Sequence, residues 1–185
     1  MARFQPLDEP ALTDRQREVA GRVRAGRRGT VPANVVAWLP SPELADRAAH
    51  LGEFVRYGTS LPPAQSEIAI LVVARHWACE YEWAIHAGEA VRAGVPAGVI
   101  DAIGRGGDPR LTGTDGLVAA FARALVATGR VDDVVHAAAL EAFGAAGVAD
   151  LVGIVGYYTL VAFTLNASEV PAPPGSPGLP AVGPR

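Results

Sequence analysis

Apolar residues recur at helical spacing along most of this chain, in segments separated by Gly and Pro. The spacing predicts longer helices over residues 15–28, 42–57, 62–77, 80–93, 114–128, 132–143 and 148–166, and shorter ones over 31–40 and 96–103. No alternation of apolar and polar residues lasts beyond a few positions, and the chain has no phosphate-binding or dinucleotide-binding glycine motif. We therefore predict an all-α fold.

Helix-capping residues mark several of the predicted ends. Ser41 and Pro42 suit the start of the helix over 42–57, and Gly94 stands where a left-handed residue commonly ends a helix. Within 42–57 the expected inward face consists of Leu44, Ala48, Leu51 and Val55.

The composition divides the chain into three parts. Residues 1–30 form an N-terminal extension with a surface helix, whose several arginines we interpret as a solvated face. Residues 31–168 form the helical domain. Residues 169–185 are a Pro- and Gly-rich tail, expected to be an extended or mobile extension because it has little to bury.

Charge and composition exclude several classes of protein. The 185 residues carry a net charge of -3, which argues against a nucleic-acid partner, since such proteins need clustered basic surface. Every basic residue is Arg, so no lysine can form a Schiff base. Eighteen uncharged residues, Leu151 to Ser168, reach the lower limit for a membrane span, but their glycines and polar residues favour a buried helix. We expect a cytoplasmic protein without a membrane partner, since no signal peptide is apparent.

Candidate chemistry gathers around the single cysteine. Cys79, Glu82 and His86 are three and seven residues apart, which places them on one face of a helix. Cys79 stands at the helix start, where free backbone N–H groups favour a thiolate. Glu67 lies in the preceding apolar helix, and an antiparallel hairpin would bring it to His86 or Cys79. Such a cluster suits a proton relay.

These residues resemble those of a known family. The segment Ser66 to Arg75, followed by Glu80-Tyr81-Glu82-Trp83 and His86, is similar to the carboxymuconolactone decarboxylase family, which includes the alkylhydroperoxidase D-like proteins. The resemblance extends to residues 32–42, 94–96 and 151–166. It implies an alkylhydroperoxidase D-like helical bundle of about seven to eight helices, assembled as a homo-oligomer, either trimer or hexamer.

One departure from the family pattern bears on which of its activities this chain would have. The peroxidase branch has Glu, eleven residues, Cys-x-x-Cys and then His, whereas here Glu82 occupies the place of the second cysteine. Dithiol peroxide reduction needs that resolving thiol. The resemblance therefore favours a cofactor-free lyase that acts on a small carboxylated or lactone substrate, with Glu67, His86 and Glu82 handling protons.

Two other functions stay open. A one-cysteine peroxidase would attack peroxide through Cys79, and a helical oligomer could bind a small ligand without turning it over. For a lyase, Arg75 or a tyrosine such as Tyr81 would hold the substrate carboxylate. Cys79 and Glu67 would equally suit structural roles, as a buried thiol and as the partner of an arginine. Glu67, Glu82 and His86 are weak evidence for a metal site, and we predict no metal and no cofactor.

Overall fold

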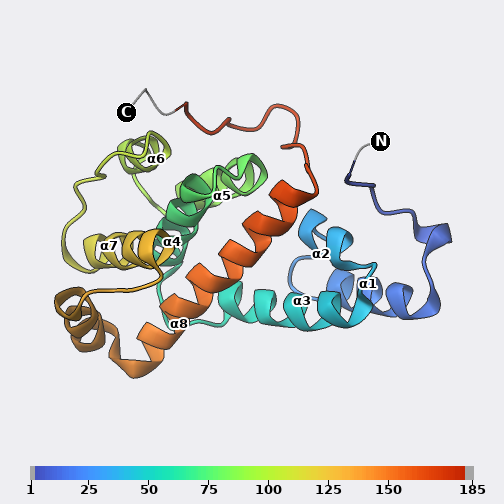
Figure 1. Ribbon diagram of the computed structural model, residues 1–185, viewed down its shortest axis with the longest axis horizontal. Coiled ribbons are helices and arrows are strands. Elements are labelled where there is room, and N and C mark those ends of the chain that lie inside the picture. Colours follow the sequence, from blue (N-terminus) through green and yellow to red (C-terminus); the bar gives the residue numbers. More distant parts are fainter. Residues whose placement is uncertain (1–2, 182–185) are drawn as a thin grey trace.

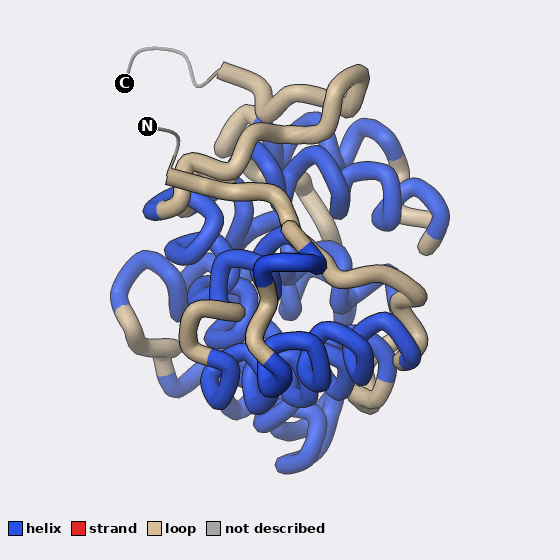
Figure 2. The backbone as a smooth tube through the Cα atoms, turned by 90° about the vertical axis from the view of Figure 1, so that its right-hand side faces the viewer, coloured by secondary structure: helices blue, strands red, loops and turns tan. Residues whose placement is uncertain are grey.

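The computed structural model describes residues 3–181, and the described chain contains helices and loops but no strand (Figures 1 and 2). After a 3-10 turn at Glu9–Ala11, the helices are α1 (Asp14–Ala25), α2 (Ala33–Trp38), α3 (Pro42–Tyr57), α4 (Pro63–His76), α5 (Glu80–Arg92), α6 (Ala97–Gly104), α7 (Gly113–Thr128) and α8 (Asp133–Ala167). The prediction of an all-α fold is confirmed.

Helix α4 is the centre of the molecule, and its middle turns are buried on every side. All residues from Gln65 to Ala74 are buried, and the helix packs against α5, α7 and α8. Figure 1 shows α8 crossing the molecule, with α6 and α7 on one side and α1 to α3 on the other. A polar side chain on α4 is therefore removed from water unless a cavity reaches it.

A tight turn joins α4 to α5. The Cys79 N–H donates to Ala74 O, and the Ala78 N–H donates to Arg75 O, while Ala78 adopts a left-handed conformation with φ 48°. This pair of hydrogen bonds is the Schellman arrangement that ends a helix. It reverses the chain within three residues, so α5 packs back along α4 as the expected hairpin requires.

The inward face of α3 differs from the prediction. Its buried residues are Ala45, Ala48, Gly52 and Val55. Leu44 and Leu51 are each 45% exposed, so their expected burial was wrong. Small residues let α3 approach α8 closely: a Cβ atom on Gly52 would lie only 2.0 Å from the Tyr157 hydroxyl.

Helix α8 is two helical segments joined at Gly144, as the two predicted periods indicated. Gly144 has φ 67° and ψ 176°, a conformation open essentially only to glycine. By length and composition α8 could cross a membrane, although core helices of soluble proteins meet the same criteria. In this structure 44% of the most apolar 18-residue stretch of α8 is buried, and the helix packs against α4 and α7. A cytoplasmic location stays a prediction.

The described part of the tail, residues 169–181, is extended but packs against the helices (Figure 2). Val170 is buried, and Leu179 lies against the hydrophobic core. Arg75 Nη1 donates to Pro180 O at 2.8 Å, and the Leu179 N–H donates to Glu80 Oε2 at 3.1 Å. For residues 169–181 the expectation that the tail has too little to bury does not hold, because α4 and α5 supply side-chain partners for its backbone and residues 182–185 lie outside the described chain.

Candidate functional site

A cavity of about 370 Å³ lies where α5, α8, the end of α3 and the α1–α2 connection meet. This volume falls in the range of small-molecule sites. We call it the main cavity, and its lining residues are Arg27, Arg28, Thr30, Val31, Pro32, Ala33, Asn34, Arg56, Tyr57, Tyr81, Glu82, Ile85, His86, Glu89, Tyr157, Tyr158 and Val161.

His86 and Glu67 form a buried pair beside this cavity. His86 Nδ1 lies 2.8 Å from Glu67 Oε2, and the two side chains are 3% and 11% exposed. The α4–α5 hairpin creates this contact between residues nineteen positions apart in the chain. A carboxylate bonded to one ring nitrogen fixes the orientation of the imidazole and directs the other nitrogen elsewhere.

Arg56 identifies which nitrogen of His86 carries the hydrogen. Arg56 Nη1 lies 3.4 Å from His86 Nε2, and a guanidinium group can only donate. Nε2 is therefore the acceptor, and Nδ1 donates to Glu67. Although burial opposes the charge of Arg56, Tyr158, Tyr57, Glu67 and Glu89 raise its pKa above the ordinary value, so Arg56 stays charged.

Glu82 faces the same histidine from one helical turn away. Its Oε2 atom lies 3.5 Å from His86 Nε2 and has no hydrogen-bond partner among the described residues. Burial raises the pKa of Glu82, while the nearby His86, Arg28 and Arg56 oppose that rise. The protonated carboxyl is favoured by burial and can donate across the short gap to Nε2.

Two tyrosines of α8 complete the wall of the main cavity. The Tyr158 ring meets the His86 ring edge-on, with 5.0 Å between centroids, and Tyr157 meets Tyr158 in the same way at 5.4 Å. Both hydroxyl groups are buried, and within residues 3–181 neither makes a hydrogen bond of good geometry, although Asn34 and Arg28 lie close to the Tyr157 hydroxyl. Burial raises the pKa of each phenol, so both stay protonated and offer donors to a ligand.

Cys79 does not line the main cavity, and its side chain is buried. Burial raises the pKa of its thiol to about 12. The helix start was expected to favour a thiolate, but the hydrogen bonds from the Glu82 and Tyr81 backbone lower the pKa less than burial raises it.

Of the two predicted substrate-binding residues, only Tyr81 lines the main cavity. Arg75 points to the opposite side of the hairpin, where it donates to Gly104 O at 3.0 Å as well as to Pro180 O. The structure thus brings Glu67, Glu82, His86 and Tyr81 together and leaves Cys79 and Arg75 outside the group.

Arg56 and Arg28 line the main cavity although the sequence did not predict them there. Arg56 lies in the last turn of α3, and Arg28 lies in the α1–α2 connection. Most arginines of this region do form surface ion pairs, such as Arg15 with Glu18 and Arg22 with Asp46. No helical spacing relates Arg28 or Arg56 to His86, so the sequence holds no local signal for either.

The structure offers no assembled set of metal ligands. Within residues 3–181, no three His, Cys, Asp or Glu side chains are arranged to hold an ion. The expectation that neither metal nor cofactor is needed stays a prediction.

Comparison with known proteins places this site within a recognised family region. The model of the carboxymuconolactone decarboxylase family matches residues 42–126. This range includes Arg56, Glu67, Glu82 and His86, and it leaves out the α1–α2 connection and α8. A comparison with curated proteins returned no match.

Proposed function

Because this chain belongs, through residues 42–126, to the carboxymuconolactone decarboxylase family, we propose that it is a cofactor-free lyase. Its substrate is a small carboxylated lactone, and its reaction is loss of CO2 followed by proton transfer to carbon. The observation that carries the proposal is the His86 imidazole held between Glu67 and Glu82, on the wall of the main cavity.

Decarboxylation breaks the bond between a carbon atom and its carboxylate, and the electron pair remains as an enolate conjugated to the lactone carbonyl. Arg56 stabilises the developing negative charge by donating to the enolate oxygen. Glu82 passes its proton to His86 Nε2, the imidazolium then protonates the enolate carbon, and Glu82 regains a proton from water in the main cavity after CO2 has left. Glu67 holds the ring in place through Nδ1 and stabilises the imidazolium.

His86→Ala tests these roles. We expect the release of CO2 from carboxymuconolactone to fall by about 10²–10⁴-fold, the usual contribution of a positioned acid or base. His136→Ala is the matched control, since His136 lies near the start of α8, away from the main cavity. Turnover that survives His86→Ala would contradict the assignment, and turnover that also falls in His136→Ala would show a nonspecific effect.

A one-cysteine peroxidase is the alternative function, and the burial of Cys79 argues against it. A thiol with a pKa of about 12 supplies little thiolate at neutral pH. We expect iodoacetamide to alkylate Cys79 in the folded protein slowly, with no plateau between about pH 5 and pH 10. Fast alkylation with a midpoint below the ordinary thiol value near 8.5 would favour the peroxidase instead.

Cys79→Ser separates the same two functions by activity. Since Cys79 does not line the main cavity, we expect this variant to retain turnover of carboxymuconolactone. Loss of turnover in a folded Cys79→Ser protein would implicate the thiol in the reaction. A non-catalytic ligand-binding role would be supported by binding of the lactone without release of CO2 from the wild-type protein.

A homo-oligomer also stays a prediction from the family resemblance. Several large apolar side chains are exposed on α3 and α8 and would be covered by a second copy: Leu44, Leu51, Phe54, Leu160 and Phe163.

A further inference from the structure

Two arginines between α1 and α2 face the main cavity without a carboxylate partner. Arg27 and Arg28 both line it, and among residues 3–181 neither has a carboxylate within ion-pair distance. Arg28 donates to the backbone at Gly52 O, 3.1 Å away, and the Arg27 guanidinium lies over the Tyr57 ring at 4.5 Å. These contacts hold the side chains in place without an ion pair.

The other charged groups beside the main cavity each have a close partner. Arg56 is paired with Glu89 at 3.0 Å, and burial favours the neutral form of Glu82. His86 and Glu67 form their own pair. The main cavity is thus lined by three arginines and one ionised carboxylate, Glu89, and the two arginines without an ion pair lie in the α1–α2 connection.

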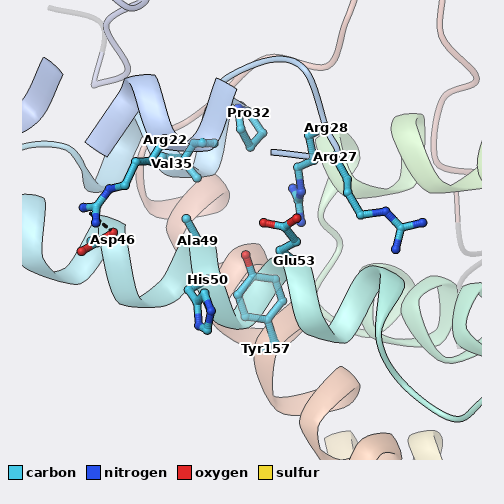
Figure 3. Close-up of a pocket in the computed structure, with 11 residues that line it drawn as sticks. Arg22, Arg27, Arg28, Pro32, Val35, Asp46, Ala49, His50, Glu53 and Tyr157 are labelled. Carbon is cyan, nitrogen blue, oxygen red and sulfur yellow. Dashed lines mark ion pairs between the residues drawn. The ribbon is translucent and has the colours of Figure 1, made fainter. Parts of the chain in front are cut away.

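A smaller cavity of about 140 Å³ adjoins the main one, and Arg27, Arg28, Pro32 and Tyr157 line both (Figure 3). Tyr157 is 4% exposed, and its hydroxyl makes no hydrogen bond of good geometry within residues 3–181, although Asn34 and Arg28 lie close to it. Glu53 and Asp46 line the smaller cavity but not the main one. Asp46 is paired with Arg22, whereas Glu53 has no ion pair among residues 3–181 and is a carboxylate neighbour of Arg27 and Arg28. A buried hydroxyl donor thus lies beside two arginines that have no ion pair, and such groups can bind an anion.

We propose that Arg27 and Arg28, with the Tyr157 hydroxyl, form the subsite that binds the carboxylate group of the substrate. All three residues lie outside the matched range 42–126, so the N-terminal extension and α8 would determine which substrate this chain accepts. The inference rests on the proposed lyase function for its substrate class. Binding of a carboxylate can nevertheless be measured without turnover.

The test compares two probes that differ by one charge: 5-oxotetrahydrofuran-3-carboxylate, a carboxylated γ-lactone, and its neutral methyl ester. Titration calorimetry at low ionic strength would measure the binding of each. We expect the wild-type protein to bind the acid more tightly than the ester. Arg28→Gln and Arg27→Gln should each weaken binding of the acid by about tenfold and leave binding of the ester unchanged.

Two further variants separate binding from folding. Arg28→Lys keeps the charge and should restore part of the lost affinity. Arg47→Gln removes a positive charge from an exposed site on α3, where Arg47 pairs with Glu43, and should bind both probes as the wild type does. Equal affinity of Arg28→Gln and wild type for the acid, or failure of the wild type to bind it at about 10 mM, would overturn the proposal.

The outcomes also distinguish this proposal from the proposed function. If the acid binds through Arg28 but no carboxylated lactone is turned over, the anion subsite stands and the lyase does not. If carboxymuconolactone is turned over and Arg28→Gln leaves its KM unchanged, the lyase stands and the subsite does not.

Discussion

At the scale of single residues, the buried carboxyl of Glu82 makes stability depend on pH. Because burial raises the pKa of Glu82 above its ordinary value of 4.5, the folded protein keeps this proton at pH values where the unfolded chain has released it. The free energy of unfolding therefore falls as pH rises above that value, by up to about 1.4 kcal/mol per pH unit until Glu82 ionises.

Glu82→Gln should remove this contribution. We expect urea unfolding of the variant to show a shallower loss of stability between pH 4.5 and neutrality than the wild type, since Gln has a similar shape and does not titrate. Glu141→Gln, at an exposed position of α8, should keep the wild-type slope. Identical slopes for Glu82→Gln and wild type would mean that Glu82 is already ionised in the folded protein.

Residue chemistry also explains which parts of the site were predictable. Glu67, Glu82 and His86 lie on two consecutive helices, so helical spacing and one short turn suffice to bring them together. Arg28 and Arg56 reach the main cavity from other elements, and only the packing of α1, α3 and α5 determines their places there. For Cys79 the local signal was present, but tertiary burial outweighs it.

At the scale of helices, the contact between α3 and α8 depends on the absence of a side chain at Gly52. A Cβ atom there would lie 2.0 Å from Tyr157 Oη and 2.5 Å from Tyr157 Cζ. We expect Gly52→Ala to lower the free energy of unfolding by about 1–3 kcal/mol, because the overlap forces the helices or the ring to move. Chemical denaturation would measure the change.

Gly156→Ala is the matched control for this contact. Gly156 lies in α8, and a methyl group added there would meet no atom within 4 Å, so the gain in helix propensity should stabilise the protein by up to about 1 kcal/mol. Equal stability of the two variants would contradict the close approach of α3 and α8.

The same contact shows why helix limits were easier to predict than helix faces. Capping residues and glycines are local signals, and Gly94 indeed follows the end of α5 with φ 90°. The face of α3 was mispredicted because large apolar residues were expected to point inward. Instead, α3 packs closely against Tyr157 through its small residues, and Leu44 and Leu51 lie on its exposed side.

At the scale of the whole molecule, segments from both ends of the chain pack on the region that matches the family. The α1–α2 connection lines the main cavity, and the tail lies over the opposite side of the hairpin, where Arg75 donates to Gly104 O and Pro180 O. Arg75 thus joins α4, α6 and the tail. Its role in this structure is to anchor the tail, at a place remote from the main cavity.

Arg75→Met should therefore affect stability and leave catalysis unchanged. Loss of two hydrogen bonds from a charged donor should lower Tm by about 4 °C or more, while KM for carboxymuconolactone stays at the wild-type value. A chain ending at residue 170 should lose at least as much stability. Because the tail supplies one of the two acceptors, Arg75→Met should cost less in the shortened chain than in the full one. A raised KM with unchanged Tm would instead place Arg75 at the substrate.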